Sequence, residues 1–408
     1  DKGLKGMEPT ASRKILITGA GSYVGMAVEQ WLLQHPEKYQ VDTLDMVSNA
    51  WKEFDFSGYD VVYHVAGIAH ADVGAVTEEQ KALYYQVNTD LAVETAKKAK
   101  AAGVKQFIFM SSMIVYSGCK EQVITERTNP QPLNFYGESK WQADQKVREL
   151  ESEGFKVVVL RPPMIYGKGS KGNYPELAKL ASKLPVFPIV RNKRSMLYID
   201  NLCEFVKLMI DNEESGVFFP QNTEYANTSD LVQVIAKVKG HHIIMVPGTN
   251  MAVKLLGKAP GKIGALASKA FGNSVYDMEM SEYKQDYRVH SFVESIKLTE
   301  SMEKESKKKH ILVISQYFYP ESFRINDMCR EWVKRGYQVT VLTGIPNYPE
   351  GEFYTGYDYD HFRTEKWNGM DIIRLYINPR KKGFANLAKN YVSFVEEGWK
   401  WLQKTGVR

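Results

Sequence analysis

The chain has 408 residues, of which 44% are hydrophobic and 25% are charged, a composition typical of a soluble globular protein with two or three domains. The net charge of +5 is small for this length, and basic residues are interleaved with acidic ones, so no nucleic-acid partner is expected. No apolar run reaches the ~18 residues that span a bilayer, and no signal peptide is recognised. The 3 cysteines are widely spaced, so we expect a cytoplasmic protein with free thiols, no integral membrane segment and no metal.

Segments that predict β-strands alternate with segments that predict helices through the first 162 residues. Strands are predicted for the apolar start of 14–35 and for 39–46, 59–67, 104–112 and 156–162. Helices are predicted for the rest of 14–35, for 81–103, which ends on Gly103, and for 136–153. This alternation predicts an α/β fold with a Rossmann-type doubly wound parallel sheet that carries helices on both faces.

The rest of the chain divides into a mixed region and a second α/β unit. We expect an NAD-binding Rossmann domain over 13–170, with later segments returning to it, and a small mixed α/β substrate-binding region over 171–298. The charged stretch 299–309 predicts a linker. Residues 310–408 predict a partial Rossmann-like unit, with strands in 311–321, 338–344 and 371–377 and a helix in 325–337.

A glycine-rich turn, "TGAGSYVG" at 18–25, joins the first predicted strand to the first helix. Small residues at such a turn let the backbone approach a pyrophosphate, which the N–H groups of the helix N-terminus can bind. Asp45 closes the second strand, 26 residues after Gly19. A carboxylate there accepts hydrogen bonds from a ribose and repels a 2′-phosphate, so the pattern favours NAD over NADP.

Three further side chains predict redox chemistry at a carbinol. Ser112 follows the fourth predicted strand, at the sheet edge where such folds bind ligands, and Tyr136 and Lys140 share a face of the next helix. We expect the lysine to lower the pKa of the phenol and the serine to hold the substrate oxygen. This set can move a proton while a nicotinamide moves a hydride.

Several segments in this order carry a family resemblance: "TGAGSYVG", "HVAG" (64–67), Asn88, "SSMIVY", "YGESK" and "RPPMIYGKG". Together they resemble the extended short-chain dehydrogenases/reductases, a family of nucleotide-sugar epimerases, dehydratases and reductases, over residues 13–298. The resemblance implies that Ser112, Tyr136 and Lys140 are catalytic. It implies an NAD site formed by Gly19, Ser22, Tyr23, Val24, Gly25, Asp45, Asp55, Phe56, Ala66, Gly67, Asn88, Tyr136, Lys140 and Pro163. Ser22 stands where the family commonly has glycine.

Residues 166–202 resemble the nucleotide-binding part of this family's substrate region, closest to UDP-N-acetylhexosamine 4-epimerases and 4-keto-sugar reductases of surface-polysaccharide pathways. The resemblance makes Asn173 and Arg194 candidates for contacts with a substrate diphosphate, beside Ser112 at the sugar. The alternative for Arg194 is a solvated turn within "RNKR". The implied partner is a UDP-sugar, and a homodimer is possible.

Residues 310–395 resemble the start of the acceptor-side half of GT-B glycosyltransferases that build exopolysaccharide. The half that binds the sugar-nucleotide donor in such enzymes has no counterpart here, so we expect no transferase activity. Segment 387–404 is amphipathic, which suits a membrane surface or, as the favoured interpretation, packing against its own domain.

The leading functional hypothesis is an NAD-dependent epimerase that acts at C4 of a UDP-sugar through a 4-keto intermediate. A 4-keto-sugar reductase or a dehydratase would use the same residues. Two hypotheses from other classes are a non-catalytic dinucleotide sensor and a glycosyltransferase with an accessory domain. The complete Ser–Tyr–Lys set argues against a sensor, and the missing donor half argues against a transferase.

Overall fold

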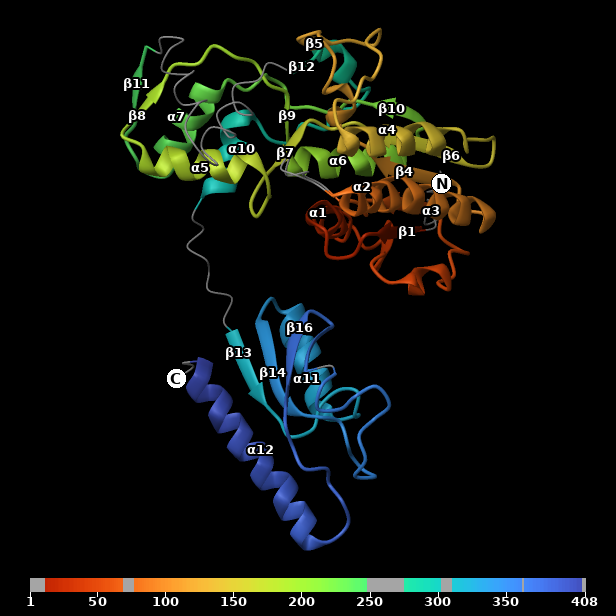
Figure 1. Cartoon of the computed structure of the whole chain (residues 1–408), viewed down its shortest axis with the longest axis vertical. Coiled ribbons are helices and arrows are strands. Elements are labelled where there is room, and N and C mark those ends of the chain that lie inside the picture. The colour runs from red at the N-terminus through yellow and green to blue at the C-terminus, as the bar shows by residue number, and fades with distance from the viewer. Residues whose placement is uncertain (1–11, 69–76, 248–274, 302–309, 362, 406–408) are drawn as a thin grey trace, which may run out of the picture. The chain divides into compact units, whose positions relative to one another are not determined.

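The computed structural model describes residues 12–68, 77–247, 275–301, 310–361 and 363–405. The chain forms two compact units, residues 1–301 and 302–408, each described by itself below (Figure 1). Most of the predicted linker 299–309 lies outside the described residues. Its first two residues are the last two of a helix, so the start of the linker prediction was wrong.

A six-stranded parallel sheet forms the centre of the first unit, in the order β10-β6-β4-β3-β1-β2 (Figure 1). The strands are β1 (Arg13–Thr18), β2 (Tyr39–Leu44), β3 (Val61–His64), β4 (Gln106–Met110), β6 (Lys156–Leu160) and β10 (Gly216–Phe218). The inner strands are apolar on both faces, as a sheet covered on two sides requires. The prediction of a doubly wound parallel α/β sheet is therefore confirmed.

Helices cover both faces of this sheet because alternate strand residues point to opposite sides. On one face, α1 (Tyr23–Leu32) and α6 (Ile199–Asp211) pack with Ile15 and Ile17. On the other face, α3 (Leu91–Ala101) and α4 (Phe135–Arg148) pack with Leu16. Strand β10 and helix α6 come from residues after 170, so the later chain returns to the sheet.

The predicted helix 81–103 is interrupted. Helix α2 (Glu78–Tyr85) continues through a π-helical turn, η2 (Gln86–Asp90), into α3. Short 3-10 turns complete the unit: η1 (Asn49–Lys52), η3 (Met113–Tyr116) and η4 (Met278–Ser281). The π turn carries Asn88, one of the residues expected at the cofactor site.

The described part of the mixed region contains small two-stranded sheets and helices that pack beside them. Strand pairs are β7 (Met164–Tyr166) with β9 (Met196–Tyr198), β8 (Val186–Pro188) with β11 (Ile244–Val246), and β5 (Val123–Ile124) with β12 (Val275–Tyr276). The helices are α5 (Asn173–Lys183), α7 (Thr228–Val238) and α10 (Phe292–Glu300).

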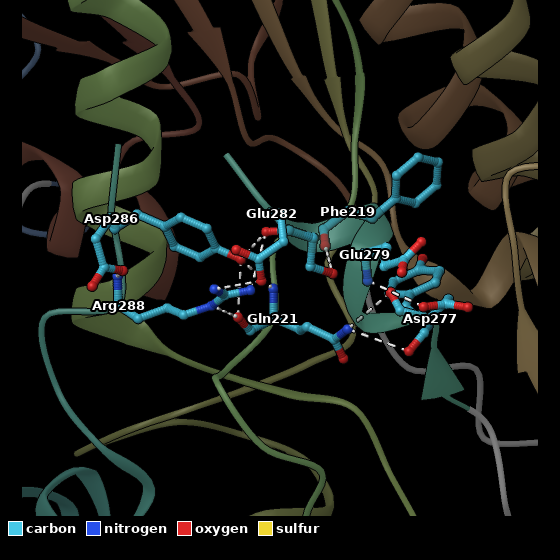
Figure 2. A network of polar contacts seen from close by, with 10 residues as sticks. Phe219, Gln221, Asp277, Glu279, Glu282, Asp286 and Arg288 are labelled. Atoms are coloured by element: carbon cyan, nitrogen blue, oxygen red, sulfur yellow. Dashed lines mark hydrogen bonds and ion pairs between the residues drawn. The ribbon is translucent and has the colours of Figure 1, made fainter. Parts of the chain in front are cut away.

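A polar network attaches the segment 275–301 to the chain that follows β10 (Figure 2). The guanidinium of Arg288 donates to the carbonyl oxygens of Gln221 and Ser281 and to the carboxylate of Glu282, at 3.0–3.1 Å. The amide of Gln221 donates to the carbonyl oxygen of Tyr276 and accepts from Ser195 Oγ at 2.6 Å. The network therefore fixes the backbone next to Arg194, a candidate substrate contact.

The C-terminal unit is a four-stranded sheet in the order β13-β14-β16-β15, with β15 antiparallel. Its elements are β13 (His310–Ile314), α11 (Arg324–Lys334), β14 (Gln338–Gly344), β15 (Thr364–Trp367), β16 (Met370–Leu375) and α12 (Phe384–Thr405). Helix α11 packs on one face of the sheet through Cys329, and α12 packs on the other through Phe394.

Candidate active site

The glycine-rich turn lies between the end of β1 and the start of α1. Gly19 has φ +118°, and a Cβ there would lie 2.7 Å from the backbone nitrogen of Ala66, so only glycine fits. Ser22 is the N-cap of α1, and its Oγ accepts from the N–H of Gly25 at 3.1 Å. The serine side chain therefore caps its own helix. The N–H groups of Tyr23 and Val24, in the first turn, have no acceptor within a helix and can bind an anion.

The two acidic residues expected in the cofactor site lie on exposed turns. Asp45 directly follows β2, is exposed, and accepts from the N–H of Val47 at 3.0 Å. Both carboxylate oxygens of Asp55 accept hydrogen bonds from Ser57, which lowers the pKa of Asp55. Phe56 is 1% exposed and belongs to the hydrophobic core, so its ring is not available to a ligand.

Asn88 is fully buried and fixes the chain after β3. Its Oδ1 accepts from the N–H of Ile68 at 2.8 Å, and its Nδ2 donates to Ser139 Oγ at 3.1 Å. A Cβ on Gly67 would lie 3.0 Å both from Asn88 Oδ1 and from Lys140 Nζ. Asn88 therefore connects the backbone of Ile68 to the helix that carries Tyr136.

Ser112 and Tyr136 are brought together by two different elements. Ser112 is the N-cap of η3, just beyond the carboxyl end of β4, and Tyr136 lies in the first turn of α4, which Asn134 caps. Burial raises the pKa of Tyr136 to about 12, and the nearby Ser112 hydroxyl opposes that rise.

Lys140 lies one turn after Tyr136 on α4 and is 7% exposed. Its Nζ donates to the carbonyl oxygen of Met110 at 3.2 Å, and burial lowers its pKa to about 8. The expectation that Lys140 lowers the pKa of Tyr136 is wrong for the protein without ligands. The phenol pKa is raised by burial, and the ammonium points to the end of β4 instead.

Residues of the expected substrate site come from the mixed region. Asn173 is half-buried at the N-terminus of α5. Arg194 pairs its backbone with Ala226, and among the described residues its Nη1 is buried without a hydrogen-bond partner. Burial lowers the pKa of Arg194. A hollow of about 480 Å³ is lined by the neighbouring residues Arg191, Asn192 and Lys193, together with Gln122, Val123, Asn227 and Val275.

Two residues expected near the cofactor are packing residues in the structure. Tyr23 packs against the core beside Gly167, where a Cβ would lie 2.6 Å from the Tyr23 hydroxyl oxygen. Pro163 is buried just before β7. Another hollow, of about 630 Å³, lies beside α2 and the start of α4, and its lining includes Phe135 but not Tyr136.

Sequence reasoning missed a buried ion pair behind the site. Asp144 on α4 is fully buried and accepts from Arg161, which follows β6, and from Ser111 Oγ, each at 2.8 Å. A signal was present in the sequence, because Asp144 lies four residues after Lys140 and eight after Tyr136, on the same side of the helix.

The described residues fit an NAD molecule. The close approach at Gly19 allows no side chain, the first turn of α1 offers N–H donors, and an exposed carboxylate, Asp45, lies at the end of the neighbouring strand β2. The buried ammonium of Lys140 is a donor close to Gly67. These groups are complementary to a pyrophosphate and to ribose hydroxyls. Within the described part of the chain, no cluster of three His, Cys, Asp or Glu side chains is arranged to hold a metal ion.

The described helices include none that is both long and apolar enough to cross a bilayer.

A sequence model of the NAD dependent epimerase/dehydratase family matches residues 15–219. The chain is 30% identical over 276 residues to a UDP-glucose 4-epimerase of Vibrio cholerae, covering 61% of this chain and 83% of the relative. It is 28% identical over 244 residues to an N-acetyl-alpha-D-glucosaminyl-diphospho-ditrans,octacis-undecaprenol 4-epimerase of Escherichia coli O157:H7. This match covers 55% of this chain and 71% of the relative.

The fold is also similar to a solved structure, a UDP-glucuronic acid 4-epimerase from Bacillus cereus in complex with NAD. The TM-score is 0.54 at 18% identity, over 71% of this chain and 97% of that one. The family match covers half of the chain, from β1 to just beyond β10, and includes every residue of the Ser112, Tyr136 and Lys140 group. The chain therefore belongs to the NAD-dependent epimerase/dehydratase family and is an NAD-dependent enzyme.

Proposed function

We propose that the protein is a 4-epimerase of a UDP-sugar, of the UDP-N-acetylhexosamine type. The observation that carries the proposal is the grouping of the Ser112 hydroxyl and the Tyr136 phenol beyond the carboxyl end of β4, with the buried Lys140 one turn further along α4. Support for the 4-position comes from the names of the two relatives, which are both 4-epimerases.

In this mechanism Tyr136 exchanges a proton with the 4-hydroxyl of the sugar, and Ser112 donates to the same oxygen. When bound, NAD supplies the acceptor for the C4 hydride and returns that hydride to the other face of the ring. Tyr136 must lose its proton before it can act as a base. The pKa of about 12 in the ligand-free protein opposes that loss, so we expect groups that arrive with cofactor and substrate to lower it.

The diphosphate of the substrate would bind at Arg194 and Asn173. A guanidinium nitrogen that is buried without a partner favours an anionic ligand, because a desolvated charge is costly until it is paired. The basic residues Arg191 and Lys193 beside the 480 Å³ hollow favour the same anion.

A 4-keto-sugar reductase is the closest alternative, since it needs the same serine, tyrosine and lysine. The two differ in the fate of the cofactor. An epimerase returns the cofactor to its starting oxidation state within one catalytic cycle, whereas a reductase ends each cycle with oxidised cofactor. A second candidate substrate keeps the sugar diphosphate and replaces the nucleoside by a polyprenol, as in the name of the Escherichia coli relative. For residues 310–395 we also propose a partial glycosyltransferase-like unit that has no transferase activity.

The deciding experiment incubates the purified protein with UDP-glucose, UDP-galactose and the two UDP-N-acetylhexosamines, and measures 4-epimer formation and NADH absorbance. We expect one pair of 4-epimers to interconvert without net NADH production. Stoichiometric consumption of NADH with a 4-keto sugar, and no epimer from any UDP-sugar, would identify a reductase instead. Conversion of the polyprenyl-linked sugars alone would establish the second candidate.

The setting of the reaction is part of the proposal. The three cysteines of the chain, Cys119, Cys203 and Cys329, are free thiols, which suits a reducing compartment such as the cytoplasm. A role in surface-polysaccharide synthesis and a homodimeric state are proposed from the resemblance alone, and sedimentation of the purified protein tests the latter.

A further inference from the structure

Helix α12 of the C-terminal unit carries apolar residues on two sides. One side packs on the sheet, where Phe394 is 8% exposed and Asn390 is fully buried. The adjoining side is exposed and contains six large apolar residues: Phe384, Leu387, Tyr391, Val392, Val395 and Trp399. We call these six residues the apolar stripe. Their spacings of about four, seven, eight, eleven and fifteen residues place them along one side of the helix.

The stripe is exposed along its whole length within the C-terminal unit. Phe384 is 88% exposed, Tyr391 is 60% exposed and Trp399 is 62% exposed. The sheet contacts the adjoining side of α12, through Phe394, and leaves these residues exposed, while α11 lies on the other face of the sheet (Figure 1). A contiguous exposed apolar surface of this kind indicates a binding surface.

Positive charge accompanies the stripe. Arg380, Lys381 and Lys382 directly precede Phe384, and Lys389 and Lys400 lie on the helix, against two acidic residues, Glu396 and Glu397. Residues 380–403 therefore carry a net charge of +3. In the described part of the chain, Lys381, Lys382 and Lys389 are exposed and form no ion pair with a carboxylate.

We propose that α12 binds the surface of an anionic phospholipid bilayer, with the apolar stripe among the upper acyl chains and the lysines at the headgroups. The helix has 22 residues, about 33 Å at the usual rise per residue. It carries Phe, Tyr and Trp along the stripe, and aromatic rings of this kind favour the membrane interface. An amphipathic helix of this composition lies in the interface without spanning the bilayer.

A second copy of the chain is a poorer occupant of the same surface. Two stripes packed against each other would bring Lys381 and Lys382 of one copy near the basic residues of the other, whichever way the helices run, and like charges oppose that contact. An anionic bilayer is complementary both to the apolar stripe and to its basic flank. Binding would hold the enzyme at a membrane surface, which the proposed epimerase chemistry does not itself require.

The test is sedimentation of the full-length protein with vesicles of phosphatidylcholine that contain about 30% phosphatidylglycerol, compared with phosphatidylcholine alone. We expect binding to the anionic vesicles that weakens steeply with added salt. The variant K381E/K382E should bind at least about tenfold more weakly, since each lysine contributes roughly fivefold. The matched control K334E/R335E makes the same change of charge at the end of α11 and should bind like the parent.

The apolar contribution is tested separately with F384S/W399S, which should lose binding at least about tenfold. Its control is M328S, which alters a residue that is 50% exposed on α11. Circular dichroism and thermal unfolding confirm that each variant is folded. Equal binding to both vesicle types, or no binding by the parent, would overturn the proposal. So would a solution mass that falls on introducing F384S/W399S, because the stripe would then be an interface between copies.

Discussion

Asp144, on the helix that carries Tyr136 and Lys140, forms a buried ion pair with Arg161. Arg161 Nε and Nη2 each donate to one carboxylate oxygen of Asp144 at 2.8 Å, and Arg161 Nη1 donates to the hydroxyl of Tyr116 at 2.6 Å. Asp144 also accepts from Ser111, the residue before Ser112. The pair therefore fixes α4 against the strand ends that carry Ser111 and Ser112.

Loss of the Asp144 carboxylate should be costly. D144A leaves the Arg161 guanidinium, in a residue that is 5% exposed, without its charge partner, so we expect a loss of about 3–5 kcal/mol in the free energy of unfolding. Urea unfolding followed by circular dichroism measures the change. The surface pair of Glu331 with Arg335 is the control, because both side chains are more than half exposed and E331A should cost at most about 1 kcal/mol. Equal costs for the two variants would contradict this account.

Removing the Tyr136 hydroxyl should stop turnover and spare cofactor binding. Y136F keeps the ring, its edge contact with Tyr84 and the helix, but removes the group that exchanges the proton. We expect kcat to fall roughly 10²- to 10⁴-fold, while the Kd for NAD changes little. Steady-state kinetics and calorimetric titration measure the two quantities, with Y85F as the control on a neighbouring helix. Activity of Y136F within about tenfold of the parent would refute the role of Tyr136 as the proton-transfer group.

The buried ammonium of Lys140 predicts a dependence of stability on pH. Its pKa falls from 10.5 in the unfolded chain to about 8 in the folded protein. Between these values the unfolded state binds more protons, so stability rises with pH, and the destabilisation is fully present below pH 8. K140M removes this dependence, which amounts to about 3 kcal/mol. Thermal unfolding from pH 7 to 10 of the parent, K140M and the exposed-lysine control K146M tests it. A parallel response of parent and K140M would show that the pKa of Lys140 is not lowered.

Asp45 should set the preference for NAD over NADP. Its exposed carboxylate follows β2 beside the glycine-rich turn, where it would accept from the adenosine ribose and repel a 2′-phosphate. We expect NAD to bind at least about tenfold more tightly than NADP, and D45A to reduce that ratio by weakening NAD binding and improving NADP binding. D42A changes an exposed acid earlier on the same strand and should leave the ratio unchanged. Tighter binding of NADP by the parent would reject the prediction.

Features that depend on residues close together in the chain were predictable from the sequence. Apolar strands, the glycine turn and the i, i+4 pair on α4 gave the sheet and brought Tyr136 and Lys140 to one edge. Contacts between distant segments were not predictable in this way. The direction of the Lys140 ammonium depends on the backbone of Met110, and the pKa of Tyr136 depends on how deeply the phenol is buried. The same applies to Asp144 and Arg161, which are 17 residues apart and meet only once the sheet is formed.

The division of the chain into two units predicts that the first is sufficient for catalysis. Residues 1–301 form one compact unit and contain Ser112, Tyr136, Lys140 and Arg194. Helix α10 ends at Glu300, whose carboxylate pairs with Lys239 at 2.7 Å, so a chain that stops after Ser301 keeps this contact. We expect the kcat and KM of the shortened chain to stay within about threefold of the parent, because each unit buries its own core. A shortened chain that shows the circular dichroism of a folded α/β protein but turns over ten or more times slower would place part of the active unit beyond residue 301. Turnover close to that of the parent would leave the C-terminal unit a role apart from the chemistry.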